Sequence, residues 1–257
     1  MKIHETAIVH PGAELGENVE IGPYSIVEEN VKIGSGTKIG PHVHLEGWTN
    51  IGSDCRIFTG ATIGNESKDL KYKQGDRSFV IIGDRNVIRE YASISRATGK
   101  DDATEIGNDN LLMTYIHIAH DCKIGSKTIL ASFATLGGHV TIEDKALIGA
   151  QASIHQFARV GTMAFAGACA KIVQDIPPYM ISDGYPARVR CLNTVGLIRN
   201  GVSTQSRLLL KRAFRLLFRS NLNRTQALEK VREEVEMCKE VAHLLEFIEA
   251  SQRGIGV

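Results

Sequence analysis

The stretch YIHIAHDCKIGS, residues 115 to 126, places two histidines and an aspartate inside an otherwise aliphatic segment. A histidine beside a carboxylate can act as a general base near neutral pH, because its unperturbed pKa is about 6.5 and the carboxylate stabilises its cationic form. Histidine nitrogens are also common zinc ligands. Three possibilities are therefore open: His120 and Asp121 form a base and its partner, the histidines bind a metal, or these residues are polar surface positions without a role.

The elements that must position these residues follow from a repeat. Aliphatic side chains recur at every sixth position, with two interruptions. A period of six fits neither a 3.6-residue helix nor a simple alternating strand, and it predicts short strands joined by tight turns, as in a β-helix solenoid. The positions in phase are Val9, Leu15, Ile21, Val27, Ile33, Ile39, Leu45, Ile51, Ile57, Ile63, Ile82, Ile88, Ile94, Ile106, Leu112, Ile118, Ile124, Leu130, Leu136, Ile142, Ile148, Ile154, Val160, Ala166 and Ile172.

This repeat resembles that of the hexapeptide-repeat acyltransferases, whose left-handed parallel β-helix uses three hexapeptides, or 18 residues, for each coil. The resemblance implies an all-β prism with the repeating aliphatic residues inside and their strand neighbours outside. Functional residues must then lie on the outer faces or in insertions. Residues 64–80 and 95–105 leave the repeat, and such insertions often build the binding face of a solenoid. The second insertion could equally be a tolerated surface excursion.

A coil of 18 residues would stack His120, Gly138 and Gln156 in one column, with neighbours about 4.8 Å apart. The other histidines expected at the same edge are His117, His139 and His155. Gly138 offers a backbone N–H without a side chain, as an oxyanion requires. No serine or cysteine shares this position, and Cys122 is expected to face inward. The column therefore predicts direct acyl transfer to a bound hydroxyl or amine.

Longer motifs make the resemblance specific. NLLMTYIHIAHDCKIG, LASFATLGGHV, SIHQFARVG and NESKDLKY are similar to the UDP-N-acetylglucosamine acyltransferase family over the whole chain. The resemblance implies transfer of an (R)-3-hydroxyacyl group from acyl carrier protein to the 3-position of UDP-N-acetylglucosamine, or of a 3-amino variant, in the first step of lipid A biosynthesis. It implies no metal and no cofactor, because the donor is carried on the phosphopantetheine arm of acyl carrier protein. It also implies a homotrimer with the site between subunits.

The same resemblance assigns roles by motif. His120 would be the general base, Asp121 its partner and the Gly138 amide the oxyanion donor. The substrate-binding positions would be Asp69, Lys71, His117, His139, His155, Gln156, Asn193 and Arg199. Ala168, in FAGACAK, would close the end of the acyl groove and so set the chain length.

The segment 184–201 departs from the family pattern. It has Gly184-Tyr185-Pro186-Ala187 where the family often has GNHA, Val195 where an acidic residue is common, and Asn200 where a second arginine is common.

Two other functions are compatible with the fold. A γ-type carbonic anhydrase-like zinc enzyme would use His117, His120 and His139 as nitrogen ligands, but it gives no role to Gly138, to KDLKY or to the C-terminal region. A non-enzymatic hexapeptide scaffold would not require a column of histidine, glycine and glutamine.

Composition excludes several other classes. The 257 residues carry a formal charge of +1, so no bulk charge favours nucleic acid or a membrane surface. Five scattered cysteines without a CxxC pair predict neither disulfides nor a cysteine zinc site. The N-terminus lacks a signal pattern and no run of 18 apolar residues occurs, so we expect a cytoplasmic protein without a transmembrane segment.

The repeat ends at Ile172, and the chain is expected to divide into a β-helix domain over residues 1–189 and a small α-helical domain over residues 190–257. Residues 203–219 predict a basic amphipathic helix, and the apolar spacing over 224–251 is helical. Four basic residues share the first of these helices and suggest an acidic partner, acyl carrier protein: Lys211, Arg212, Arg215 and Arg219.

Overall fold

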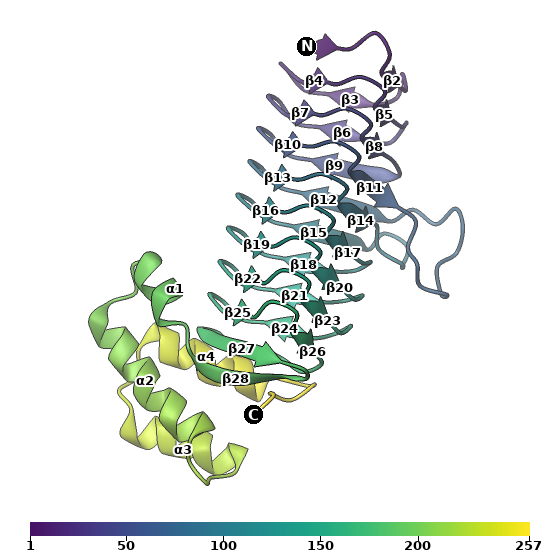
Figure 1. Ribbon diagram of the computed structural model, residues 1–257. Coiled ribbons are helices and arrows are strands. Elements are labelled where there is room, and N and C mark those ends of the chain that lie inside the picture. Colours follow the sequence, from purple (N-terminus) through teal and green to yellow (C-terminus); the bar gives the residue numbers. More distant parts are fainter.

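The computed structural model describes residues 1–257, and it shows a triangular prism of short parallel strands with four helices at its C-terminal end (Figure 1). Three sheets of 11, 9 and 8 strands form the sides of the prism. Within each sheet, hydrogen-bonded neighbours are three strands apart in the chain up to β26, so every coil gives one strand to each side. The predicted left-handed parallel β-helix with a C-terminal helical region is confirmed.

The 11-stranded sheet contains β1 (Lys2–Ile3), β4 (Glu20–Ile21), β7 (Lys38–Ile39), β10 (Arg56–Ile57), β13 (Val87–Ile88), β16 (Leu111–Leu112), β19 (Ile129–Leu130), β22 (Leu147–Ile148), β25 (Phe165–Ala166), β27 (Met180–Gly184) and β28 (Ala187–Leu192). The 9-stranded sheet contains β2 (Ile8–Val9), β5 (Ile26–Val27), β8 (His44–Leu45), β11 (Thr62–Asn65), β14 (Ser93–Ser95), β17 (His117–Ile118), β20 (Thr135–Leu136), β23 (Ser153–Ile154) and β26 (Lys171–Ile172). The 8-stranded sheet contains β3 (Glu14–Leu15), β6 (Lys32–Ile33), β9 (Trp48–Ile51), β12 (Phe79–Ile82), β15 (Ala103–Ile106), β18 (Lys123–Ile124), β21 (Thr141–Ile142) and β24 (Arg159–Val160).

Most strands are only two residues long, and the second residue points into the prism. Ile118, for example, is fully buried while the adjacent His117 is half-buried on the outside. Stacked strands keep one register, so that His117 lies beside Thr135 and Thr135 beside Ser153. The aliphatic residues of the repeat thus form one continuous core, in which inward positions from Val19 onward are at most a few per cent exposed.

The two insertions leave the prism at the same edge (Figure 1). The first joins β11 to β12 and the second joins β14 to β15. They contact one another, because the hydroxyls of Ser67 and Thr98 are 2.7 Å apart and the Arg77 guanidinium donates to Asp101. The second insertion is therefore part of one two-loop structure.

A buried arginine attaches the first insertion to the prism. Arg96 is 7% exposed, and its guanidinium donates to the Tyr72 hydroxyl at 2.7 Å and to the Gly64 carbonyl at 3.2 Å. It also lies over the rings of Trp48 and Tyr72. A guanidinium can stack on aromatic faces and donate in its plane at once, so one side chain fixes the path of the loop.

The C-terminal region contains α1 (Thr194–Arg199), α2 (Thr204–Phe218), α3 (Arg224–Glu234) and α4 (Lys239–Glu249). The basic helix expected over 203–219 is present as α2, with Ser203 as its N-cap. The helical spacing over 224–251 corresponds to two helices, α3 and α4. Val235 adopts an extended backbone and its side chain is 4% exposed, so the chain leaves helical geometry there to bury this residue. The boundary expected after residue 189 falls inside β28. None of the four helices has both the length and the apolar character needed to span a bilayer.

An ion pair joins the prism to the helices. His243 on α4 lies with Nε2 3.0 Å from Oε2 of Glu143, and its Nδ1 is 2.9 Å from the Tyr179 hydroxyl. Hydrogen bonding to Glu143 raises the pKa of His243. Burial would raise the pKa of Glu143, but hydrogen bonds from His243 and Thr162 outweigh it and lower that pKa. The charged pair is therefore favoured in the folded protein.

This pair predicts a pH-dependent stability. The folded pKa of His243 lies above its unfolded value of about 6.5, so its contribution is fully present below that pH and is lost as pH rises through the raised pKa. The half-exposed site limits the effect to about 1 kcal/mol or less. We expect the free energy of unfolding of the wild type, measured in urea, to fall between about pH 6 and 8 by more than that of His243→Gln. Parallel pH curves for the two proteins would contradict this.

Candidate active site

His120 and Asp121 form a hydrogen-bonded dyad at the turn between β17 and β18. Nδ1 of His120 is 2.7 Å from Oδ2 of Asp121. The carboxylate can only accept, so Nδ1 carries the proton and Nε2 keeps a free lone pair. The Asp121 backbone adopts φ +60° and its N–H donates to the Thr104 hydroxyl, which fixes the carboxylate beside the ring. The predicted base and partner are thus in contact, with Nε2 directed away from Asp121.

The dyad is shielded from solvent although it lies outside the aliphatic core. His120 is only 9% exposed. Its ring leaves the aliphatic core as predicted, but the two insertions cover it: Thr98 contacts Nδ1, and Asp69 lies with Oδ2 4.0 Å from Nε2. The repeat alone could not predict this cover, because it is built by residues that leave the repeat.

Thr98 is a site residue that the sequence did not indicate. Its backbone N–H donates to both carboxylate oxygens of Asp121, at 3.3 and 3.2 Å. Its hydroxyl lies 3.0 Å from Nδ1 of His120 and 2.7 Å from the hydroxyl of Ser67. Thr98 therefore links the dyad to both insertions. A threonine in SRATG has no distinctive spacing, so only the three-dimensional contacts identify it.

Removing the Thr98 hydroxyl is expected to misorient the base. Thr98→Val keeps the backbone N–H and the side-chain shape but loses the hydroxyl contacts to Ser67 and to His120. The contact to His120 is worth about 1 kcal/mol, or roughly a fivefold change. We expect kcat of acyl transfer to fall by about that factor with little change in the KM for the sugar nucleotide. Thr98→Ser restores the hydroxyl and should restore kcat. Equal losses in the Val and Ser variants would show that the hydroxyl has no positioning role.

Gly138 lies directly against the base in the next coil. A Cβ placed on Gly138 would lie 2.4 Å from Cε1 and 2.6 Å from Nε2 of His120, so no other residue fits without moving the ring. The flanking amides are used, because His139 N–H donates to the His120 carbonyl and Gly137 N–H to that of Ile154. The Gly138 N–H donates to no protein acceptor. A free backbone donor thus lies beside the base, as the column predicted.

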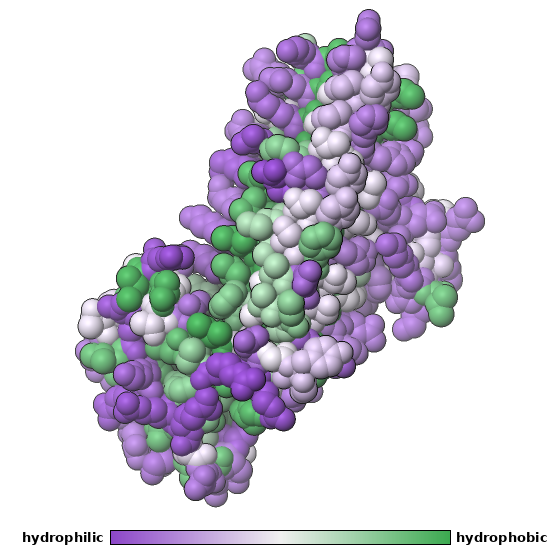
Figure 2. All heavy atoms as spheres, in the orientation of Figure 1, coloured by the Kyte–Doolittle hydropathy of each residue, from purple (hydrophilic) through white to green (hydrophobic).

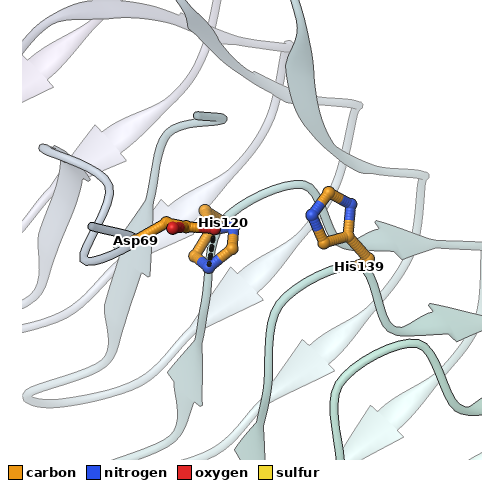
Figure 3. A group of neighbouring side chains, drawn as sticks. All are labelled: Asp69, His120 and His139. Carbon is orange, nitrogen blue, oxygen red and sulfur yellow. Dashed lines mark ion pairs between the residues drawn. The ribbon is translucent and has the colours of Figure 1, made fainter. Parts of the chain in front are cut away.

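Several predicted residues surround the dyad. His139 meets the His120 ring edge-on, with centroids 5.4 Å apart, and stacks on Phe157. Asp69 accepts the Lys71 backbone N–H through Oδ1, and this bond lowers its pKa. Burial lowers the pKa of His117, with Lys68 and His120 adding to the effect, so this histidine is neutral at pH 7. Figure 3 shows Asp69 and His139 on two sides of His120.

Other predicted residues lie further along the same edge. His155 and Gln156 are exposed one coil beyond Gly138, and the Phe157 N–H donates to the Gly138 carbonyl. The Lys71 side chain is exposed. The structure therefore brings the histidine edge and the first insertion together as one surface.

Three predicted residues do not reach the dyad within one chain. Asn193 is the N-cap of α1, where its side chain accepts from Gly196 N–H and donates to the Met163 carbonyl. Arg199 is exposed at the end of α1. Ala168 lies at the turn between β25 and β26, a different edge of the prism from that of His120.

The three-histidine zinc ligand set of the carbonic anhydrase alternative does not form. One group of three potential ligands is present instead, and it consists of Asp69, His120 and His139. Their ligand atoms all lie within 4.8 Å of one another. His117 is not part of it.

Two known protein families match separate parts of this chain. A family described as bacterial transferase hexapeptide (six repeats) matches residues 30–65 and 103–138, and one described as UDP N-acetylglucosamine O-acyltransferase, domain 2, matches residues 175–256. The acyl-[acyl-carrier-protein]–UDP-N-acetylglucosamine O-acyltransferase of Thermodesulfovibrio yellowstonii is 49% identical over 99% of this chain and 98% of its own length. This chain belongs to the UDP-N-acetylglucosamine O-acyltransferase family.

Other members of the UDP-N-acetylglucosamine O-acyltransferase family agree with this assignment. The relative from Janthinobacterium sp. is 47% identical, covering 98% of each chain. The crystal structure of the UDP-N-acetylglucosamine O-acyltransferase from Moraxella catarrhalis superposes with a TM-score of 0.94 at 39% identity, covering all of both chains. Membership favours the acyltransferase interpretation over both the γ-type carbonic anhydrase and the non-enzymatic scaffold.

Proposed function

We propose that this protein transfers an (R)-3-hydroxyacyl group from acyl carrier protein to the 3-position of UDP-N-acetylglucosamine, the first step of lipid A biosynthesis. The observation that carries the proposal is the dyad: His120 Nδ1 is bonded to Asp121 at 2.7 Å, and its Nε2 lies free beside the unused Gly138 N–H. The names of the full-length relatives support the same donor and acceptor.

The proposed reaction is a direct transfer. His120 Nε2 takes the proton of the acceptor 3-hydroxyl as its oxygen attacks the thioester carbonyl. The Gly138 N–H stabilises the negative oxygen of the tetrahedral intermediate, and Asp121 stabilises the imidazolium. The intermediate then expels the pantetheine thiolate, which takes the proton from His120. The transfer is proposed to need no metal and no cofactor besides the phosphopantetheine arm of the carrier.

Cys122 supports transfer without a covalent acyl-enzyme. It is fully buried inside the prism, where its Sγ lies 3.2 Å from the Gly137 carbonyl. Burial raises its pKa to about 12. Since the thiolate is the nucleophilic form of cysteine, this thiol is inert at neutral pH.

The residues around the dyad are proposed to hold the substrates. Asp69 and Lys71 would contact the sugar nucleotide or the pantetheine arm. A neutral His117 suits a hydrogen bond to the 2-acylamino group of the sugar. The other proposed contacts along the edge are His139, His155 and Gln156. A 3-amino acceptor would use the same base.

We propose a homotrimer, supported by an apolar stripe on the 11-stranded sheet. Its outward residues in the first coils are charged: Lys2, Glu20, Lys38 and Arg56. From β13 onward they are apolar and only half-buried: Val87, Leu111, Ile129, Leu147, Phe165 and Ile181. Figure 2 shows a hydrophobic band down this part of the prism. Exposed apolar patches of this extent mark protein interfaces.

Further apolar groups are exposed, three of them at an edge of the sheet that carries the stripe. Tyr91, Tyr115 and Phe133 stack at the adjacent turn and are each about half exposed. Leu70, in the first insertion, is fully exposed. In a trimer, Asn193 and Arg199 of one subunit would serve the nucleotide bound at the dyad of a neighbour. A sedimentation mass of one chain at micromolar concentration would refute this assembly.

Ala168 is proposed to end the acyl groove at the same edge as these aromatic residues. Gly149 packs closely against Ala168 at the stacked turn, since a Cβ on Gly149 would lie 2.6 Å from the Ala168 nitrogen. A methyl group at the end of a packed groove should shorten the preferred chain slightly relative to a glycine.

Acyl carrier protein is proposed to dock on α2, in the cytoplasm. Lys211, Arg212 and Arg215 are exposed. Arg219 differs from our expectation, because its guanidinium donates to the carbonyls of Arg190 and Phe218 and so holds the helix end. Three basic residues therefore remain for an acidic partner.

Charge reversal on α2 is expected to weaken use of the carrier. Lys211→Glu/Arg212→Glu should raise the KM for acyl carrier protein by about tenfold or more at low salt, with a smaller effect in high salt. Lys2→Glu/Lys32→Glu, at the opposite end of the prism, is the matched control and should leave this KM unchanged. Wild-type kinetics independent of salt would argue that α2 is only a solvated face.

The proposed function is tested by incubating the purified protein with UDP-N-acetylglucosamine and 3-hydroxyacyl carrier proteins of graded length. We expect a 3-O-acylated sugar nucleotide and free carrier thiol in equal amounts. Comparison with Ala168→Gly, which should favour longer donors, tests the groove in the same assay. Absence of product with every donor would refute the function.

A further inference from the structure

Asp69, His120 and His139 converge on one point outside the prism (Figure 3). One ligand atom from each lies within 4.8 Å of the other two. They come from three separate segments: the first insertion, the turn after β17 and the turn after β20. Two imidazole nitrogens and one carboxylate oxygen form a ligand set typical of zinc sites with an open coordination position.

Each of these side chains is oriented by a contact outside the cluster. His120 Nδ1 donates to Asp121, which leaves Nε2 facing Asp69. Asp69 Oδ1 accepts the Lys71 backbone N–H, which leaves Oδ2 toward His120. His139 is stacked on Phe157, with ring centroids 4.6 Å apart. A carboxylate that holds the second nitrogen of a histidine is the usual outer support of a zinc ligand.

The surroundings also suit a dication. A second carboxylate, that of Asp121, lies close to the cluster, with its Oδ2 3.6 Å from His139 Nε2. His120 is buried, whereas His139 is exposed and can approach it from solvent. Closing the cluster to zinc-ligand distances of about 2.0–2.2 Å thus requires movement mainly of the exposed ring and of a loop side chain.

We propose that Asp69, His120 and His139 bind one zinc ion per chain. The ion binds the lone pair on Nε2 of His120. The proposed transfer needs this same lone pair to accept the proton of the acceptor. Bound zinc therefore inhibits acyl transfer, and this consequence rests on the proposed function, whereas the binding itself does not. The ion competes with the acceptor and takes no part in the reaction.

Direct binding provides the first test. Zinc is titrated by calorimetry into chelator-treated full-length protein, and tetrahedral cobalt absorption provides a second measurement. We expect one ion per chain, with affinity reduced at least about tenfold by Asp69→Asn and by His139→Ala. His44→Ala is the matched control, because His44 lies 3.0 Å from Glu28 and 4.0 Å from Glu46 through different ring nitrogens and so forms no convergent ligand group, and it should bind as the wild type does. Magnesium, which prefers oxygen ligands, should not compete.

Activity is measured separately in the same zinc titration. The proposed site would be overturned if the wild type bound no stoichiometric zinc. It would also be overturned if Asp69→Asn and His139→Ala bound zinc as tightly as the wild type. Binding that depends on these residues without loss of acyl transfer would overturn occupation of Nε2. Residue-dependent binding to a protein that transfers no acyl group would refute the proposed function and leave the zinc site in place.

Discussion

His120→Ala is expected to lower kcat of acyl transfer by about 10²–10⁴-fold, the range for loss of a general base. The His120 imidazole lies against Gly138, whose N–H is unused, and Asp121 holds its Nδ1 so that Nε2 is the basic nitrogen. The ring lies outside the aliphatic core, and its removal should therefore leave the cooperative unfolding of the prism intact. Single-turnover measurement with saturating substrates provides the test.

His155→Ala is the control for this experiment. His155 is exposed on the same edge and its Nδ1 lies 3.0 Å from the Gln156 carbonyl, but it does not touch the dyad. Its loss should raise the KM for the sugar nucleotide more than it lowers kcat. If His120→Ala kept more than about a tenth of wild-type turnover, the assignment of the base would be wrong.

Gly138→Ala is expected to lower kcat by an amount comparable to that of His120→Ala, but for a steric reason. The new Cβ would lie within 2.6 Å of His120 Nε2 and must displace the ring from Asp121 and Thr98. A shift of about 1 Å in a reacting group can cost roughly 10²-fold in rate. We expect kcat to fall by at least that factor, with KM values changed much less.

A double-mutant cycle separates this steric effect from general damage. Combining Gly138→Ala with His120→Ala removes the ring that the methyl group would displace. The two changes should then be strongly non-additive, because Gly138→Ala lowers the rate only by displacing the His120 ring. Additive losses would mean that Gly138→Ala disturbs something other than the base.

The repeating part of the molecule could be predicted from the sequence in detail. Ile118 and Ile154 are buried, Cys122 faces inward and Gly138 lies against His120, since one register governs every stacked coil. Position in the repeat fixes which way a side chain points, and a period of six leaves few alternatives.

Features outside the repeat could not be predicted in this way. The 9% exposure of His120 and the contacts of Thr98 depend on how two loops pack, and that packing depends on Arg96 lying between Trp48 and Tyr72. Helix α3 ends at Glu234 because Val235 is buried in an extended conformation. The apolar spacing could not reveal this end, because a continuous helix would place Val235 on the same apolar face. Such contacts join residues with no fixed spacing.

The two insertions also bear on how this protein can change. Ile51, Ile82 and Ile106 are paired in register although 31 and 24 residues separate them instead of 18. The additional length is accommodated wholly outside the prism, and the strands stack as if it were absent. Loops of new length can thus arise in evolution without disturbing the stacked coils that carry His120 and Asp121, provided that they keep the contacts of Thr98 to this pair. The coils and the loops can in this sense vary separately, on one chain, except where Thr98 joins them.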